Sequence, residues 1–525
     1  MLKKTAYYLS LAALLAPLVA NAEQPVQSSA NELSSLLHDL SPCGKLPASL
    51  DQAAQSRLQQ FYGQQQNQPA WSTPARLQEL HEQIAQLADD GLSPSEYPLP
   101  ALQGDTGNNS NTACADILTS HSFLQALQHL QGGRLHPKAA ERLWRAPDLP
   151  ASDSQAASLA VAIAHLEQPS AAFAAARPQS LQYQQLRQAY AQQRQHSLAQ
   201  WQALASGQLL KPNGQDLRLP QLRTRLSAEG YLTLPANNAD SSYDPATQQA
   251  LQDFQRDHGL NPDGVLGPAS LTELNISPAV RREQLRANLE RLRWLGNDLN
   301  HAEVLINVAA AELQVWQQQQ LRWSTRVQVG RAERATPLLI SQINRLTLNP
   351  TWTVPPTIWR EDKLPAIRQD LGYLDKHQLS VIDHDGNVLD PLTIDWQNPG
   401  AVMLRQAAGK ANPLGRMAVR FANPFAVYLH DTPSQHLFSK APRAFSAGCV
   451  RVEAVDSLLD WLLSADEATA VRERIATGET QQYRLKQPKT LLMAYWTAAA
   501  NADGKLQYYP DIYRQDQPLI QALPH

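Results

Sequence analysis

Cysteine is scarce in this chain, and so is any surplus of charge. Three cysteines among 525 residues cannot supply a disulfide-rich scaffold or a zinc module built on cysteine. Lys and Arg number 45 against 48 Asp and Glu, so the basic surplus that accompanies a dominant grip on nucleic acid phosphates is missing. With 43% hydrophobic and 18% charged residues, the composition is that of a globular protein. At about 150 residues a domain, the length favours three or four domains.

The first 22 residues have the pattern of an export signal. Lys3 and Lys4 give the positive start, an apolar run follows to Val19, and Ala20-Asn21-Ala22 provides a small-x-small cleavage site. The run is shorter than the ~20 residues that span a bilayer, and no later stretch is long and apolar enough to do so. We therefore expect a signal peptide over residues 1–22 and a soluble mature protein in a bacterial periplasm.

That compartment changes the meaning of the three cysteines. In an oxidising space Cys43 and Cys114 can pair, and closing a loop of about 70 residues would contribute about 4 kcal/mol in the chain-entropy model. Two separate free thiols are the alternative. In either case Cys449 is left over, and an unpaired thiol in an exported protein needs a reason.

Most of the N-terminal half is predicted to be helical. Residues 23–35 are small and polar and are expected to form a flexible leader. Over residues 36–214, apolar side chains recur at helical spacing, as at Leu77, Leu80 and Ile84. This stretch is interpreted as an all-α scaffold domain, and it contains neither clustered carboxylates nor the spacing of a metal site.

A compact three-helix module is predicted over residues 215–277. Asp244-Pro245 has the pattern of a helix start, since Asp can cap the first amides and Pro fits the first helical position. Ala250, Leu251 and Phe254 then lie on one helix face, and Gly259 ends the helix.

The residues of this module resemble a known family. The segments that carry the resemblance are Leu226-x3-Gly230-Tyr231, Phe254-Gln255-x2-His258-Gly259-Leu260 and Asp263-Gly264-Val265-Leu266-Gly267. They closely resemble the peptidoglycan-binding domain of cell-wall hydrolases and transferases. Because the matching positions are mostly core and turn residues, the resemblance supports the fold more strongly than it supports glycan binding.

The periodicity changes from helical to alternating after a charged linker helix, predicted over residues 278–300. Val304, Ile306 and Val308 alternate, and so do later segments between turns. A mainly β catalytic domain is therefore predicted over residues 301–487.

An insertion interrupts this β domain over residues 355–400. It has a helical stretch and a hairpin turn at Asp385-Gly386, and we interpret it as a lid. Residues 488–525 are expected to form a C-terminal extension that packs on the scaffold or the catalytic domain. The predicted fold class is thus multidomain α+β: an all-α scaffold, a three-helix module and a mainly β domain with an inserted lid subdomain.

The segment from Tyr428 to Val452 carries the candidate chemistry. A thiol nucleophile needs a base, donors for a developing oxyanion, and small neighbours that let substrate approach. His430 ends an alternating strand, and Gly448 gives backbone access beside Cys449. A helix predicted just downstream would begin near the thiol, where its unpaired amides favour a lowered thiol pKa. Arg451 adds a fixed positive charge suited to a substrate carboxylate or to stabilising the loop.

Each of these residues also has an ordinary structural reading. A lone buried cysteine is more often a small hydrophobic side chain than a nucleophile, and a strand histidine is usually structural. Arg451 would ordinarily be a surface ion-pair partner, and neither HExxH nor CxxC occurs in the chain. The joint pattern, with one cysteine unpaired, favours the chemical interpretation.

The same segment resembles a catalytic family. His430 with Ser446-x-Gly448-Cys449-x-Arg451 looks like the signature of the L,D-transpeptidase (YkuD-type) catalytic domain. The resemblance extends to Asn412-Pro413-Leu414-Gly415-Arg416, Asn349 through Pro356, and Asp503-Gly504 through Asp511-Ile512-Tyr513. With the scaffold and the inserted module, most of the mature chain resembles the large periplasmic YcbB-type enzymes. Many small family members carry His before the Gly-Cys pair, where this chain has Ala447.

The resemblance implies acyl transfer on cell-wall stem peptides. Cys449 would attack the carbonyl of the third residue, meso-diaminopimelate, in a tetrapeptide donor and release the terminal D-Ala. The amine of a second diaminopimelate would resolve the thioester and give a 3→3 cross-link. The resemblance also implies acylation by carbapenems, and no metal or organic cofactor is needed.

The implied site follows from these roles. Cys449 is the predicted nucleophile, His430 the general base, and the backbone amides of Gly448 and Cys449 the oxyanion donors. Predicted substrate contacts are Tyr428, Arg451, Ser446 and Trp352.

Two other functions remain open at this point. Water could resolve the thioester, which would make an L,D-carboxypeptidase or endopeptidase. Alternatively, the chain could be a non-catalytic peptidoglycan-binding scaffold. Peptidoglycan stem peptides are the expected partners in all three cases, with peptidoglycan synthases as further candidates.

Overall fold

The computed structural model describes residues 24–100, 109–139, 141–150, 154–195 and 202–524. The predicted signal peptide lies outside these residues. The chain forms two compact units, the first made of the residues up to Gln83, Ser95–Ala126 and Leu159–Ala172, and the second of the remainder. In the described ranges, no helix combines the length and apolarity needed to cross a membrane.

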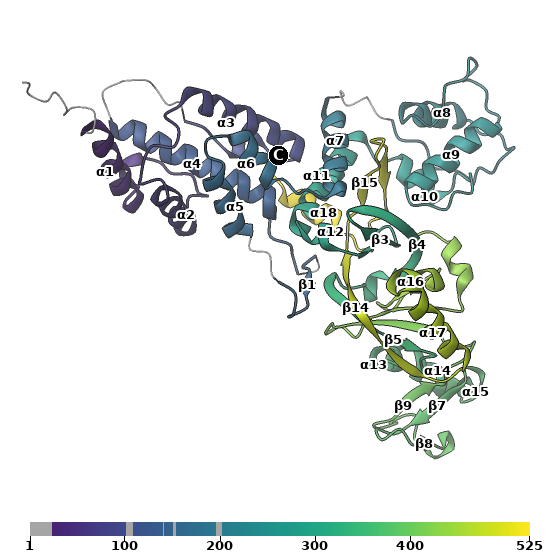
Figure 1. Cartoon of the computed structure of the whole chain (residues 1–525). Helices are drawn as coiled ribbons and strands as arrows, with labels where there is room; N and C mark the ends of the chain where they lie inside the picture. The colour runs from purple at the N-terminus through teal and green to yellow at the C-terminus, as the bar shows by residue number, and fades with distance from the viewer. Residues whose placement is uncertain (1–23, 101–108, 140, 151–153, 196–201, 525) are drawn as a thin grey trace, which may run out of the picture. The chain divides into compact units, whose positions relative to one another are not determined.

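Helices make up nearly all regular structure before residue 200 (Figure 1). They are α1 (Gln24–His38), α2 (Gln52–Gly63), α3 (Pro74–Gln86), α4 (Asn109–Gly132), α5 (Ser154–Ala164), α6 (Pro169–Ala176) and α7 (Leu181–Gln195), with η1 (Ser41–Cys43), η2 (Leu87–Asp90) and η3 (Pro94–Glu96). The expected flexible leader is corrected, because α1 begins at Gln24. A short strand, β1 (Trp144–Arg145), also interrupts the predicted all-α stretch, since it pairs in parallel with a strand of the β domain.

The first unit is organised around a buried carboxylate and a disulfide. Tyr62 donates to Asp116 over 2.5 Å, and the amides of Ala70 and Trp71 donate to the same carboxylate over 2.9 and 2.8 Å. Burial raises the pKa of Asp116, and these donors offset part of that cost. Cys43 and Cys114 form a disulfide, with Cα atoms 5.4 Å apart, so the pairing left open by the sequence is present.

The predicted three-helix module consists of α8 (Leu219–Ala228), α9 (Pro245–Asp257) and α10 (Pro268–Leu274), which group together in Figure 1. Asp244 caps α9 by accepting from the Thr247 amide over 2.8 Å. Leu222, Leu251 and Phe254 are fully buried in its core. The module therefore has its own hydrophobic centre.

The predicted linker helix is a core element of the second unit. Helix α11 (Pro278–Leu295) buries Leu285, Leu289 and Leu292, and α12 (Asp298–His301) follows it. The side chains of Glu290 and Arg293 form a completely buried ion pair. The buried pair is stable because each charged group also has a further hydrogen bond. Glu290 accepts from the Leu135 amide, and Arg293 donates to the Asp90 carbonyl.

The β domain is one long sheet that closes on itself. Its strands are β2 (Val304–Asn307), β3 (Glu312–Gln317), β4 (Gln320–Gly330), β5 (Leu339–Leu348), β10 (Met417–Phe421), β11 (Leu429–His430), β12 (Ala444–Ser446), β13 (Val450–Val452) and β14 (Gln481–Ala494). The order is β1-β5-β10-β11-β13-β4-β3-β2-β14, β12 pairs with β4, and β14 also pairs with β5. The predicted boundary at residue 487 thus falls inside β14.

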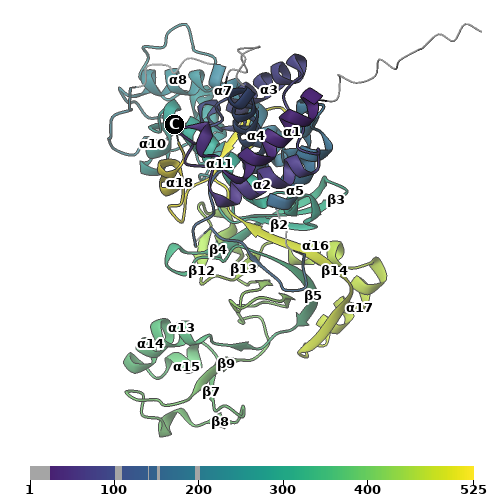
Figure 2. The same ribbon diagram turned by 90° about the vertical axis from the view of Figure 1, so that its left-hand side faces the viewer.

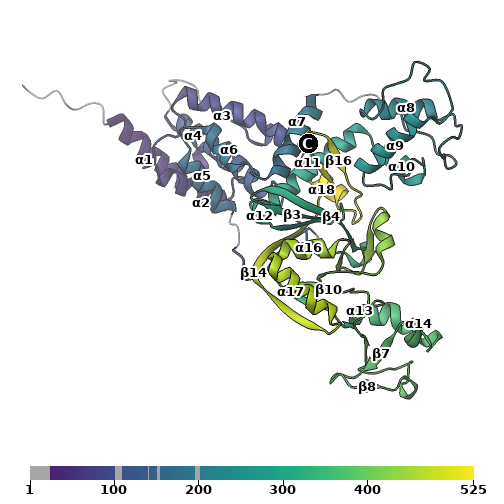
Figure 3. The same ribbon diagram turned by 45° about the vertical axis from the view of Figure 1, so that its right-hand side comes forward.

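The core of this domain lies on one face of the sheet. Val419, Leu429, Val450 and Val452 point into it, together with Leu458. Helices α16 (Val455–Leu462) and α17 (Ala465–Ala476) pack on that core, and Figure 3 shows them beside β14. The remaining elements are η4 (Ala332–Arg334), η7 (Gln435–Ser439), β15 (Ala498–Ala500), β16 (Leu506–Tyr508) and α18 (Asp516–Ala522).

The insertion folds as a subdomain with its own core. It contains β6 (Trp352–Thr353), α13 (Pro356–Ile358), the π-helical η5 (Trp359–Lys363), α14 (Leu364–Gln369), α15 (Tyr373–Lys376), β7 (Leu379–Ile382), β8 (Val388–Leu389), η6 (Pro391–Thr393) and β9 (Met403–Gln406). Figure 2 shows α13–α15 beside strands β7–β9. The β7–β8 hairpin confirms the predicted turn, whereas β6 and β9 extend the insertion beyond the predicted 355–400.

Replacing Cys43 and Cys114 together by serine should destabilise the first unit without affecting Cys449. The residues are 71 apart in sequence, so the unfolding free energy should fall by about 4 kcal/mol. Hydrogen exchange should locate the loss in unit 1. Unchanged exchange there would contradict the expectation, and the reactivity of Cys449 serves as the internal control.

Candidate active site

The loop that carries Cys449 lies between two strands of the sheet, β12 and β13. Cys449 is half-buried and is the free cysteine of the described residues. The next residue, Val450, enters the core and donates its amide to the Tyr428 carbonyl over 3.1 Å. Backbone pairing therefore fixes the position of the thiol.

The strand register brings several predicted site residues to neighbouring positions. Strands β11 and β13 are parallel, with Leu429 opposite Val450 and His430 opposite Arg451. Since Leu429 and Val450 face the core, His430 and Arg451 face the other way, while Cys449, just before β13, also packs against the edge of the core. Arg451 is close enough to His430 and to Cys449 for its charge to lower the pKa of each.

His430 is held in one orientation and in one protonation state. Its exposed fraction is 4%, and Nδ1 lies 2.5 Å from the Asp431 carbonyl oxygen. A carbonyl can only accept, so Nδ1 carries the proton in this contact, and the Pro413 carbonyl is a second backbone acceptor beside the ring. Burial first, and then the charge of Arg451, lower the pKa of His430 to about 3. The imidazole is therefore neutral at physiological pH.

The environment of the sulfur does not make a resting thiolate. Burial raises the pKa of Cys449, and this outweighs the contributions of the Tyr428 amide, Arg420 and Arg451, which lower it. The expectation that the start of the downstream helix would give a lowered thiol pKa is therefore wrong, because burial outweighs the contributions that lower it. The resting pair is a neutral thiol and a neutral imidazole.

Gly448 has a backbone conformation that suits glycine. Its φ of +112° lies in the region that L side chains rarely adopt. Its amide donates to the Ser446 hydroxyl oxygen over 3.1 Å, and that hydroxyl donates to the Cys449 carbonyl over 2.5 Å. Ser446 is 3% exposed, so its hydroxyl braces the loop from inside.

Two residues that the site prediction did not include, Thr336 and Tyr513, hold the Cys449 loop in place through hydrogen bonds. Thr336, 2% exposed, donates to the Gly448 carbonyl and accepts from the Gly330 amide, over 2.9 and 2.8 Å. Tyr513 accepts from the Thr336 amide and donates to the Gly330 carbonyl, over 2.9 and 2.8 Å. The Asp511-Ile512-Tyr513 resemblance was the available signal for Tyr513; Thr336 had none.

The other two predicted substrate contacts lie in different places. Arg451 is half-buried and donates to the Gln328 side chain over 3.1 Å, while its buried Nε has no hydrogen-bond partner among the described residues. Trp352 lies in β6 and packs on the core of the inserted subdomain, with the Lys363 ammonium 5.8 Å from its ring. The structure therefore groups Arg451, but not Trp352, with Cys449.

The segment from Asn412 to Arg416 connects the histidine strand to the insertion. Asp431, beside His430, accepts from the Arg416 amide over 2.9 Å. Asn412, 1% exposed, donates to the carbonyls of Pro350 and Ala407, over 3.0 and 2.9 Å. These two carbonyls lie at the two ends of the insertion, so one buried amide ties both roots together.

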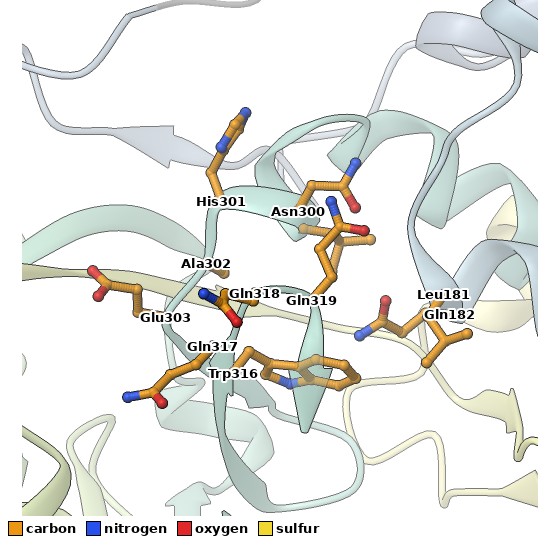
Figure 4. Close-up of a pocket in the computed structure, with 11 residues that line it drawn as sticks. Leu181, Gln182, Asn300, His301, Ala302, Glu303, Trp316, Gln317, Gln318 and Gln319 are labelled. Atoms are coloured by element: carbon orange, nitrogen blue, oxygen red, sulfur yellow. The ribbon is translucent and has the colours of Figure 1, made fainter. Parts of the chain in front are cut away.

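A pocket of about 210 Å³ lies elsewhere on the second unit (Figure 4). Trp316, Gln317, Gln318 and Gln319 are among its lining residues, which include none of the predicted site residues. Among the described residues, no group of three or more His, Cys, Asp or Glu side chains could hold a metal ion.

Fold and site define a mainly β domain that presents a free cysteine beside a buried histidine, attached to a helical region. Three families match parts of the chain: "Scaffold domain" over residues 56–189, "Putative peptidoglycan binding domain" over 216–274 and "L,D-transpeptidase catalytic domain" (YkuD) over 301–492. The chain thus carries an L,D-transpeptidase catalytic domain and a peptidoglycan-binding domain, and the predicted fold class is confirmed.

Relatives with curated descriptions agree with these domains. A "Putative L,D-transpeptidase" of Haemophilus influenzae is 34% identical over 242 residues, which is 45% of this chain and 49% of that protein. A "Probable N-acetylmuramoyl-L-alanine amidase" of Bacillus licheniformis is 35% identical over 75 residues, 14% of this chain and 21% of that protein. The chain therefore spans about half the length of the first relative and about a fifth of the second.

Solved structures with similarity to the chain include two L,D-transpeptidases. One, from Xylanimonas cellulosilytica, is 16% identical with a TM-score of 0.18, and the match covers 55% of this chain and 98% of that one. The other, from Mycobacterium smegmatis, is 15% identical with a TM-score of 0.16, covering 37% and 58%.

The rate at which iodoacetamide alkylates Cys449 should report its raised pKa. Only the thiolate reacts, so the rate should rise about tenfold per pH unit from pH 6 to 8 and show no plateau. Because the pKa of His430 is about 3, no step from histidine titration should occur in that range. Mass spectrometry measures the adduct, and a plateau below pH 7 would indicate a thiolate–imidazolium pair instead.

Replacing Tyr513 by phenylalanine should loosen the Cys449 loop while the core stays intact. The change leaves the Thr336 amide and the Gly330 carbonyl without their partner, at a cost of about 1–3 kcal/mol. Hydrogen exchange at Gly330 and Thr336 should accelerate. Tyr509→Phe is the matched control, since its hydroxyl contacts Gln507, and equal exchange in both variants would contradict the role given to Tyr513.

Proposed function

We propose that this protein is an L,D-transpeptidase that forms 3→3 cross-links between diaminopimelate residues of peptidoglycan. The observation that carries the proposal is the free thiol of Cys449 directly before β13, the strand paired with the strand of His430, within a matched L,D-transpeptidase catalytic domain. The peptidoglycan-binding domain in the same chain supports peptidoglycan as the substrate.

The chemistry begins when a donor tetrapeptide brings its reacting carbonyl to Cys449. The sulfur attacks that carbonyl carbon as its proton passes to the imidazole of His430. A tetrahedral intermediate forms, and the bond to the terminal D-Ala nitrogen breaks as that nitrogen takes the proton. The product is a thioester on Cys449 and free D-Ala.

In the second half-reaction the side-chain amine of another diaminopimelate attacks the thioester. The amine loses a proton to His430, the carbon–sulfur bond breaks, and the thiol is restored with the proton. One amide has been exchanged for another, so no external energy source is required.

Three groups have supporting roles in this proposal. The Gly448 amide already donates to Ser446, so the Cys449 amide is the more available oxyanion donor, and Gly448 would join it only by exchanging its partner. Tyr428, which contacts the sulfur through its backbone and its side chain, would orient the donor. Arg451 would offer its unpartnered Nε to a substrate oxygen.

The inserted subdomain is proposed as a lid over the donor peptide. Arg334 follows the active-site strand β4 and forms ion pairs with Glu361 and Asp362 of the insertion. The Arg334 carbonyl lies 3.9 Å from the position that a Cβ on Gly448 would occupy. Movement of the insertion is thereby coupled to the wall of the site, and Trp352 would act from within the lid.

Export to the periplasm is proposed with the function. The Cys43–Cys114 disulfide supports it, because such bonds persist in oxidising compartments. Peptidoglycan synthases would be the partners that supply new strands. Hydrolysis of the thioester, giving a carboxypeptidase, is the second candidate, favoured by the partial exposure of Cys449.

The decisive test is incubation of the protein with purified tetrapeptide muropeptides, followed by product mass. We expect 3→3 dimers and free D-Ala from the native protein and neither from Cys449→Ala, which keeps the fold because alanine fits the space. Tripeptide without dimer would support the hydrolytic candidate. Intact mass after meropenem should rise by one adduct on Cys449, and normal dimers from Cys449→Ala would refute the proposal.

A further inference from the structure

Three arginines lie in a single row across neighbouring strands of the catalytic sheet. Arg345 on β5 is opposite Arg420 on β10 and also opposite Arg484 on β14. Paired residues on adjacent strands point to the same face, so the three side chains share one face. We call Arg345, Arg420 and Arg484 the arginine row.

The row leads to the candidate nucleophile. Strands β10 and β11 are antiparallel, with Ala418 opposite His430 and Val419 opposite Leu429. The residue opposite Arg420 is therefore Tyr428. The Arg420 guanidinium carbon lies 3.9 Å from the centre of the Tyr428 ring. Tyr428 in turn contacts the sulfur of Cys449. Adjacent strands are about 4.8 Å apart, which places the three arginines about 10, 14 and 19 Å from Cys449 along the row.

A double bulge opens a hollow at the outer end of the row. Both pairings of β5 skip Asn344: Ile343 is opposite Phe421 on one side and Lys489 on the other, with register shifts at each. Bulges bend strands and re-aim side chains. Here a pocket of about 330 Å³ results, lined by Asn344, Arg345, Phe421, Ala422 and Arg484.

The positive charges of the arginine row have no acidic partner in the described part of the chain. Across the described part of the chain, no carboxylate lies within ion-pair distance of any of the three guanidinium groups, whereas many other arginines of the catalytic domain have such a partner. Arg345 and Arg484 are exposed, and Arg420 is half-buried, donating to Thr347 over 3.3 Å. Guanidinium groups match the planar geometry of carboxylates and bind them with two parallel hydrogen bonds.

We propose that the arginine row is a carboxylate-binding subsite that holds the anionic groups of the donor peptide while its reacting carbonyl lies at Cys449. The identity of the peptide rests on the proposed function; the anion site itself does not. From Arg420 to Arg484 the row is two strand spacings long, about 10 Å, which is the length of about three residues of an extended peptide at ~3.3 Å each. Binding at the row orients the donor before the thiol reacts.

The test measures binding apart from turnover. In the Cys449→Ala background, the affinity for a tetrapeptide with diaminopimelate at position three is compared with that for the same peptide with its free carboxylates amidated. We expect the double change Arg345→Gln and Arg484→Gln to weaken binding of the carboxylate peptide about tenfold and to leave the amidated peptide unaffected. High salt should reduce the difference, because exposed charges are screened.

Controls separate this inference from the proposed function. Arg322→Gln removes an exposed arginine of β4 outside the row and should not change the affinity. Equal affinity of the native and double-variant proteins for the carboxylate peptide would overturn the inference, even if cross-linking proceeds. Arginine-dependent binding without any product from the native protein would support the subsite and overturn the transpeptidase proposal.

Discussion

The parallel pairing of β11 with β13 is the constraint on which the candidate site depends. A two-residue strand and a three-residue strand carry the histidine and the segment after the cysteine, and their register decides which side chains share a face. If β11 slipped by one residue against its neighbours, His430 would turn into the core and Leu429 would turn out of it. The large apolar core behind these strands therefore protects the chemistry on the other face, since any slip would cost the burial of several aliphatic side chains.

Burial favours the neutral form of both reacting groups, the Cys449 thiol and the His430 imidazole. It disfavours the thiolate and the imidazolium separately, so the resting site stays neutral. In the proposed reaction the proton moves only as the sulfur attacks, and the charge that develops is spread over an oxyanion close to backbone donors and two arginines. A neutral resting thiol reacts slowly with stray electrophiles, which suits a cysteine in an oxidising compartment. Reactivity would then depend on a bound donor rather than on a standing ion pair.

The sequence predicts those helices, strands and turns whose local pattern agrees with the tertiary structure. The Asp244 cap, the alternation at Val304–Val308 and the hairpin at Asp385-Gly386 are all local signals, and each element is present. Strand pairing is not local: β14 continues through residue 487 because its later residues pair with β2, two hundred residues earlier in the chain. Helix α1 begins in a polar stretch, where composition alone favoured a leader. For the site, motif spacing singled out Cys449 and His430, but the raised thiol pKa results from burial that outweighs Tyr428, Arg420 and Arg451, which no spacing reveals.

The same limit explains why the supports of the loop escaped prediction. Thr336 has no motif around it, yet its hydroxyl bridges the Gly330 amide, six residues earlier, and the Gly448 carbonyl, 112 residues later in the sequence. Asn412 belongs to a recognisable segment, but its function as the tie between the two ends of the insertion follows only from the carbonyls it reaches. Both residues are almost fully buried and polar, and each satisfies backbone groups that would otherwise be orphaned. The backbone around Cys449 and the root of the insertion are therefore each held by one buried polar side chain, which acts on groups far away in the sequence.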